Sequence, residues 1–108
     1  MRTAEFAASV AVDGDVGVLD LSGEITSAAE QGLLAAYDEV KDVGVVICDF
    51  ADVDYINSTG IALIVGILAQ ARAASQEIRA RGLAEHYREI FRITRLSDFM
   101  TILDDEGE

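Results

Sequence analysis

The chain has 108 residues, 51% of them hydrophobic, and its 8 Lys and Arg residues against 20 Asp and Glu residues give a formal net charge of −12. This length predicts a single domain over residues 1–108 with its core at about 6–103, and the apolar content is sufficient for a folded core. The acidic charge argues against nucleic acid and anionic membrane surfaces as partners, because both would repel the chain.

Membrane insertion and metal binding are also not expected. The longest uncharged run, residues 56–71, contains polar residues and is shorter than the roughly 20 apolar residues of a membrane span. No stretch of signal-peptide type precedes Asp13, which predicts a cytoplasmic protein. One cysteine, Cys48, and one histidine, His86, exclude an internal disulfide and a zinc-finger fold. We therefore expect no metal and no other cofactor.

The first third of the chain predicts a hairpin followed by a helix. Residues 6–12 and 16–21 alternate in hydrophobicity on either side of a turn at 13–15, as in two antiparallel strands. Apolar residues at helical spacing, after a capping-box pattern that begins at Ser27, predict a helix over residues 28–41.

The middle of the chain predicts the central strand and a buried helix. Residues 45–50 form a continuous β-branched run, typical of a strand that is covered on both faces. An acidic turn at 51–54 and a loop at 55–60 follow. Apolar residues at helical intervals then predict a mostly buried helix over 61–77, with Leu68 in the core.

The last third of the chain predicts an edge strand at 78–83, a helix at 84–93 and a short final element. The resulting order of strands and helices requires right-handed crossovers between parallel strands. An α/β sheet is the fold class that satisfies this order.

Few side chains in this pattern point to catalysis. The chain contains no phosphate-binding glycine loop and no hydrolase motif. Cys48, within the central strand, is expected to be a small buried side chain without a neighbouring base. His86, between acids in the last helix, is expected to be exposed, and the acidic turn residues do not follow calcium-loop spacing. The sequence therefore predicts a protein that is not an enzyme.

The segment Asn57-Ser58-Thr59-Gly60 places two hydroxyl groups where a loop becomes a helix, and two interpretations are open. In the first, Ser58 or Thr59 caps the helix and contributes about 1 kcal/mol. In the second, Ser58 is a regulatory phosphorylation site. A phosphate there would add roughly −2 charge at the positive end of the helix dipole and could switch off a partner interface.

Four segments together resemble the STAS family, and bacterial anti-sigma factor antagonists most closely. They are residues 21–25, 45–50, 55–61 and 90–96. The resemblance covers about residues 6–103 and preserves the order of elements and the loop spacing. It implies a small single-domain fold with a mixed, mostly parallel sheet, helices packed mainly on one face, and a first strand at the sheet edge.

The resemblance also implies a function. In such antagonists a partner anti-sigma factor that is also a serine kinase phosphorylates a serine in an Asp-Ser-Ser/Thr-Gly loop, and the unphosphorylated form binds that partner and frees sigma. The matching serine is Ser58, with Thr59 as the secondary phosphorylation site. The implied partner-binding residues are Glu24, Thr26, Asn57, Ser58, Thr59, Gly60 and Ile61. A homodimer is left open.

The chain departs from the family pattern at two positions, where Asn57 and Thr26 replace the usual Asp residues. Neutral side chains are less suited to orient an acceptor hydroxyl or to meet a kinase's metal ion, so these departures affect the switch more than the binding. The alternative function is a non-phosphorylated STAS scaffold in a larger signalling or transport assembly, in which Ser58 serves only as a cap.

The charges are unevenly distributed along the chain. Residues 1–58 contain 2 basic and 12 acidic side chains, whereas residues 59–108 contain 6 and 8. We therefore expect a partner to meet the N-terminal half with a basic surface.

Overall fold

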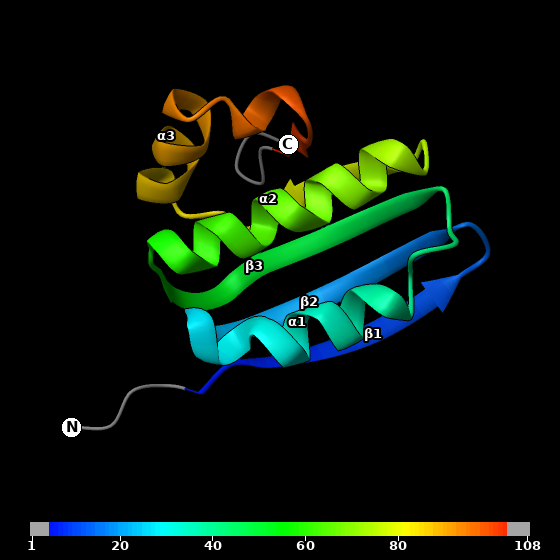
Figure 1. Ribbon diagram of the computed structural model, residues 1–108, viewed down its shortest axis with the longest axis horizontal. Helices are drawn as coiled ribbons and strands as arrows, with labels where there is room; N and C mark the ends of the chain where they lie inside the picture. Colours follow the sequence, from blue (N-terminus) through cyan, green and yellow to red (C-terminus); the bar gives the residue numbers. More distant parts are fainter. Residues whose placement is uncertain (1–4, 104–108) are drawn as a thin grey trace.

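Five strands form one sheet in a computed structural model that describes residues 5–103 (Figure 1). The strands are β1 (Ala7–Asp13), β2 (Val16–Ile25), β3 (Val45–Ile56), β4 (Glu77–Arg81) and β5 (Thr101–Ile102). Their order in the sheet is the order along the chain, with β1 antiparallel to β2 and every later pair parallel. The predicted mixed, mostly parallel α/β sheet with its first strand at the edge is therefore confirmed.

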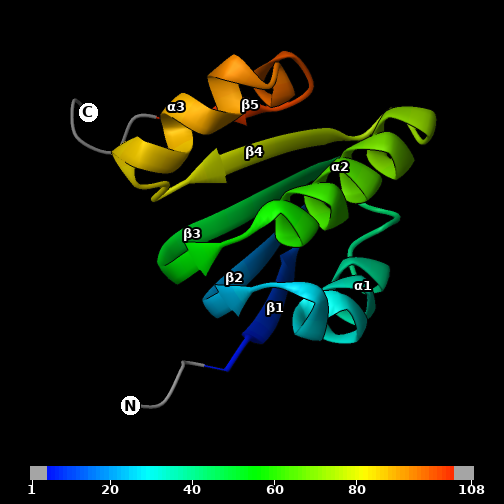
Figure 2. The same ribbon diagram turned by 60° about the vertical axis from the view of Figure 1, so that its left-hand side comes forward.

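The helices lie together on one face of this sheet (Figures 1 and 2). They are α1 (Glu30–Asp38), α2 (Ser58–Ala73) and α3 (Glu85–Ile93), with short 3-10 turns η1 (Ser27–Ala29) and η2 (Leu96–Asp98). Within residues 5–103, no helix is both long and apolar enough to cross a membrane.

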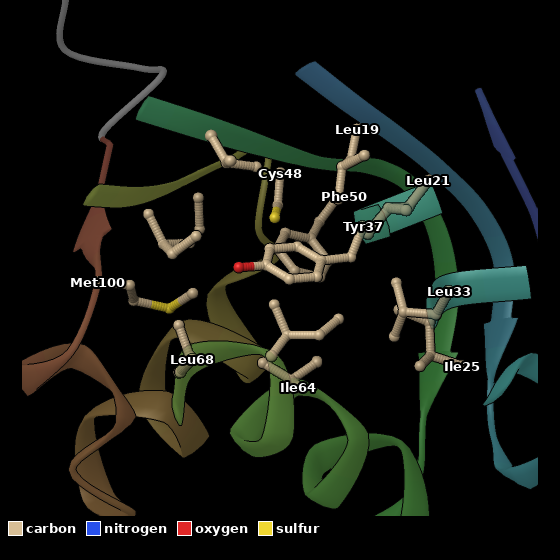
Figure 3. Packing of buried hydrophobic residues seen from close by; sticks show 14 of the residues in the cluster. Leu19, Leu21, Ile25, Leu33, Tyr37, Cys48, Phe50, Ile64, Leu68 and Met100 are labelled. Carbon is tan, nitrogen blue, oxygen red and sulfur yellow. The ribbon is translucent and has the colours of Figure 1, made fainter. Parts of the chain in front are cut away.

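The core lies between the sheet and the helices (Figure 3). Alternate residues of the strands point to the helices, so that Leu19, Leu21, Cys48 and Phe50 are buried while their neighbours are not. Leu68 is 5% exposed, as predicted. Burial also raises the pKa of the Cys48 thiol to about 12, which agrees with the prediction of an inert buried cysteine.

Gln76 is a buried polar residue that links the segment after α1 to the start of β4. Its amide nitrogen donates to the carbonyl oxygens of Val40 and Val43, at 2.8 Å each, and its oxygen accepts from the Tyr37 hydroxyl at 2.7 Å. In the part of the chain that the structure describes, no buried side-chain nitrogen or oxygen lacks a hydrogen-bond partner.

The predicted acidic turn at 51–54 is wrong, because these residues continue β3. The strand β3 pairs with β4 only as far as Asp49, so its second half pairs with β2 as its one neighbouring strand among residues 5–103. Asp52 and Asp54 are exposed there. Two register shifts, between Asp20 and Ser22 and between Gly23 and Glu24, accommodate this half of the strand.

The helix boundaries also differ from the predicted ones. Thr26, not Ser27, caps the first helical segment, and α1 itself begins at Glu30 and ends at Asp38. The helix α2 spans Ser58–Ala73 instead of 61–77, because it is capped from the preceding residue and because Ser75, with φ of 58°, redirects the chain into β4. The prediction for α3 is confirmed to within one residue.

Candidate functional site

The candidate site lies where β2 and β3 end side by side and the chain turns into α2 (Figure 2). Glu24 is paired with Tyr55 and Ile25 with Ile56, and the Asn57 amide donates to the Ile25 carbonyl at 3.3 Å. Parallel pairing therefore brings together two segments that are about thirty residues apart in sequence. The implied partner-binding residues of both segments share this edge of the sheet.

Asn57 is the N-cap of α2. Its backbone is extended, with φ of −98° and ψ of −175°, and its side-chain oxygen accepts from the Gly60 amide at 2.8 Å. The prediction that Ser58 or Thr59 caps the helix is therefore wrong. The sequence does not reveal this role, because Asn57, Ser58 and Thr59 are all favourable caps. Which of them is the cap depends on the residue at which the helix begins.

Ser58 and Thr59 are the first two residues of α2, and both are exposed. Neither hydroxyl makes a hydrogen bond within residues 5–103. The Ser58 hydroxyl is thus accessible to a partner at the positive end of the helix dipole and is not needed to hold the helix start.

Gly60 supports the loop from the inside. It is buried, and a Cβ atom added there would lie 2.0 Å from the Ile25 carbonyl oxygen. Only a residue without a side chain lets α2 approach the end of β2 this closely. Ile61 is half-buried, and its amide donates to the Asn57 carbonyl at 2.9 Å, which completes the first turn.

Thr26 and Glu24 form the other side of the site, and both are half-buried. The Thr26 hydroxyl accepts from the Ala28 amide at 3.3 Å and so caps the turn η1. The two positions at which the chain departs from the family pattern, 26 and 57, therefore both carry neutral caps.

The exposed side of α2 next to the site has no charge, although the molecule is strongly acidic. No charged residue occurs in α2 before Arg72. The exposed residues along this stretch are Ser58, Thr59, Ala62, Val65, Gly66 and Ala69. Val65 is 44% exposed, and Tyr55, at the end of β3, is 47% exposed. The exposed residues of α2, which we call the α2 face, form an uncharged surface of a kind that suits protein binding. Tyr55 is opposite Glu24, whereas its neighbour Ile56 is opposite the buried Ile25, so Tyr55 lies on the helix-free face of the sheet.

Tyr87 anchors the site from α3. Its hydroxyl accepts from the Ile56 amide at 3.0 Å, one residue before the capping Asn57. The sequence predicts the helix that carries Tyr87 but not this hydrogen bond, which depends on how α3 packs. His86 next to it is exposed, as predicted.

Groups for metal-dependent or nucleophilic catalysis are not assembled here. Among the described residues, no three His, Cys, Asp or Glu side chains are placed to hold a metal ion. The Cys48 thiol is buried in the core, away from the exposed loop. The geometry presents a hydroxyl and an uncharged surface, which suit recognition by another protein.

A family model described as "Mlab, STAS domain" matches residues 8–104 of the sequence. The chain belongs to the STAS domain family. The match includes every strand and helix of the STAS domain except the first residue of β1, so the resemblance found from four segments holds for the whole fold.

Relatives of this STAS domain carry the names of regulatory factors. The anti-sigma-B factor antagonist of Listeria monocytogenes is 36% identical over 70 residues, which cover 65% of this chain and 61% of that protein, and that of Listeria innocua matches equally well. The chain thus spans about 61% of the length of these curated relatives. Their names agree with the expectation of a binding protein that is not an enzyme.

Solved structures support the fold. SpoIIAA, an anti-sigma factor antagonist in its unphosphorylated form, is 18% identical with a TM-score of 0.71, over 93% of this chain and 88% of that chain. An anti-sigma factor antagonist from Mycobacterium paratuberculosis is 21% identical with a TM-score of 0.71, over 91% of this chain and 85% of that chain. At these identities the likeness concerns the fold.

Proposed function

We propose that this STAS domain is an anti-sigma factor antagonist, a cytoplasmic regulatory module that binds an anti-sigma factor with serine kinase activity. The observation that carries the proposal is the exposed Ser58 hydroxyl at the start of α2, beside a separate residue, Asn57, that caps the helix. The name of the Listeria relatives supports the class of partner.

The partner docks on the Ser58 loop and the α2 face. Val65 provides exposed apolar area, and the small residues Ala62, Gly66 and Ala69 of the same helix let a partner backbone approach it closely. Acidic side chains lie on the two strands that end at the Ser58 loop, with Asp52 and Asp54 on β3 and Glu24 on β2. A partner with an apolar centre and a basic rim complements this arrangement.

Phosphorylation of Ser58 weakens that docking. A phosphate on the first residue of α2 is stabilised by the helix dipole, so the modified loop keeps its structure. The phosphate nevertheless adds roughly −2 charge and bulk at the centre of a surface that a partner must cover. Neutral Asn57 favours this state, because it caps the helix without placing a carboxylate next to the phosphate.

Mass analysis of the protein purified from its own cells tests the modification. We expect one phosphate in the wild type and none in Ser58→Ala, while Ser27→Ala, which alters an exposed serine in the turn η1, keeps the phosphate. The absence of phosphate from the wild type under every growth condition would contradict the switch. In that case the unphosphorylated scaffold is the remaining interpretation.

A binding measurement with a purified anti-sigma factor kinase tests the docking independently. Ser58→Glu should weaken binding about tenfold or more, whereas the uncharged variant of similar size, Ser58→Gln, should bind nearly as the wild type does. Affinities of both variants equal to that of the wild type would place the interface elsewhere. The alternative function is a non-phosphorylated scaffold in which Ser58 serves only as a helix cap. Ser58 does not have that role, because Asn57 caps α2.

A further inference from the structure

The outer edge of β1 is an unprotected strand edge. Over Ala7–Asp13 the strand pairs with β2 alone, in an unbroken register from Ala7 opposite Ser22 to Asp13 opposite Val16. Its sequence, AASVAVD, contains no proline, lysine or arginine, and no bulge interrupts it. Proteins in which an edge strand stays unpaired usually carry one of these features there, because free backbone groups of an edge pair with other strands.

The hairpin geometry identifies the backbone groups that face outward. Asp13 and Val16 flank the two-residue turn at 14–15, in which Gly14 has φ of +63°, so they form the hydrogen-bonded pair that closes the hairpin. Hydrogen-bonded and non-hydrogen-bonded positions alternate along an antiparallel pair. The amide and carbonyl groups of Ala8, Val10 and Val12 therefore point away from β2, and no hydrogen bond from another part of residues 5–103 reaches them.

We propose that two copies of this chain associate by antiparallel pairing of their β1 edges, about a two-fold axis at Val10, so that their sheets join into one. In this register Val10 lies opposite Val10 of the partner subunit, and Ala8 lies opposite Val12 of the partner subunit. All three outward-facing residues of each β1 are then paired. Shifting the register by two residues keeps the required alternation and moves the axis by one residue, to Ser9 or Ala11. In either case one outward-facing residue is left without an opposite strand residue.

The side chains of β1 suit this register. Val12, which is 52% exposed at the end of the strand, is placed beside a small alanine. On the helix-free face Ala7, Ser9 and Ala11 are small and exposed, so they do not obstruct a second strand. Asp13 lies opposite Ala7 of the partner subunit, so no two carboxylates of the paired strands are directly opposed.

Charge sets how tightly the two copies associate. A net charge of −12 on each copy opposes the pairing, and one pair of strand edges is a small interface. The dimer is therefore expected to be weak and to become stronger when salt screens the repulsion. The pairing uses no residue of the Ser58 loop or the α2 face, so it stands independently of the proposed function.

Sedimentation and amide exchange on the intact protein test the proposal. From micromolar to millimolar concentration the mass should shift from monomer toward dimer, and added salt should favour the dimer. The amides of Ala8, Val10 and Val12 should be protected from exchange only in the concentrated sample, whereas those of Ser9 and Ala11 are protected throughout. A monomer at all concentrations, or a dimer without this alternation, would overturn the proposal.

Two variants separate the backbone contribution from that of the side chain. Val12→Pro removes an outward-facing amide hydrogen at an edge position that tolerates proline, and should weaken association about tenfold or more. Val12→Ala loses the same side chain but keeps the amide hydrogen, so it should stay within a few-fold of the wild type. Thermal unfolding verifies that both variants fold. Equal association of folded Val12→Pro and wild type would contradict edge pairing.

Discussion

Asn57 and Ser58 are adjacent residues with separate tasks. The Asn57 side chain satisfies the Gly60 amide at the start of α2, and the Ser58 hydroxyl remains exposed to solvent. Asparagine and aspartate are caps of similar strength, so a neutral cap preserves the helix start while removing a charge from beside the serine. The residue proposed for regulation can therefore change chemically with little effect on the fold.

This separation predicts different stabilities for two alanine variants. Asn57→Ala should lower the free energy of unfolding by about 1 kcal/mol, because the Gly60 amide loses its partner. Ser58→Ala should change it by less than about 0.5 kcal/mol, because the serine side chain makes no hydrogen bond within residues 5–103. Urea unfolding measures both. A loss in Ser58→Ala as large as in Asn57→Ala would show that the serine is the cap.

The loop sequence alone could not distinguish these roles. Asn, Ser and Thr are all favourable N-caps, and the capping residue is the one whose backbone is still extended when the next residue becomes helical. That boundary depends on the contact of Gly60 with the Ile25 carbonyl, which forms only when α2 packs on the end of β2. By contrast, the buried Cys48 and the exposed His86 could be predicted, because each depends mainly on its own element.

Among the elements, α2 carries both the core and the proposed binding surface. Leu68 is 5% exposed and packs among buried side chains of the sheet, whereas Val65, on the same helix, is 44% exposed. Leu68→Ala should therefore lower the free energy of unfolding by about 2–5 kcal/mol. Val65→Ala, the matched control, should lower it by less than about 1 kcal/mol. Similar losses in both variants by urea unfolding would contradict this division of the helix.

Strand β3 shows where element prediction fails. Its first half, between β2 and β4, is predicted correctly from its continuous β-branched run. The expectation that both of its faces are covered is wrong, because the helices lie on one face and Val45 and Ile47 on the other face are half-buried. Its second half borders one strand and has exposed acids, a composition that is also typical of a turn. Pairing with β2, from Ser22 opposite Asp52 to Ile25 opposite Ile56, keeps it extended, and those contacts come from distant sequence.

At the scale of the whole molecule, charge and apolar surface are segregated. Most acidic residues precede α2 in sequence, whereas most basic residues follow it and several form ion pairs. Arg81 contacts Asp49 at 3.0 Å, and Arg79 contacts Glu77 at 2.8 Å. Residues 59–108, with 6 basic and 8 acidic side chains, are nearly neutral, so residues 1–58, with 2 and 12, are the main source of the negative field.

This field predicts opposite responses of two associations to salt. Raising the salt concentration from about 0.1 M to about 1 M shortens the screening length from about 10 Å to about 3 Å. Binding of a basic anti-sigma factor to the acidic N-terminal half should weaken about tenfold or more, because screening removes attraction between opposite charges. Pairing of two acidic copies through β1 should strengthen, because the same screening removes repulsion. Calorimetric titration of the partner and sedimentation of the chain alone measure the two responses.

Partner binding that is insensitive to salt would show that the acidic half does not form the interface. The sedimentation result tests the β1 pairing separately, because it uses the chain without a partner.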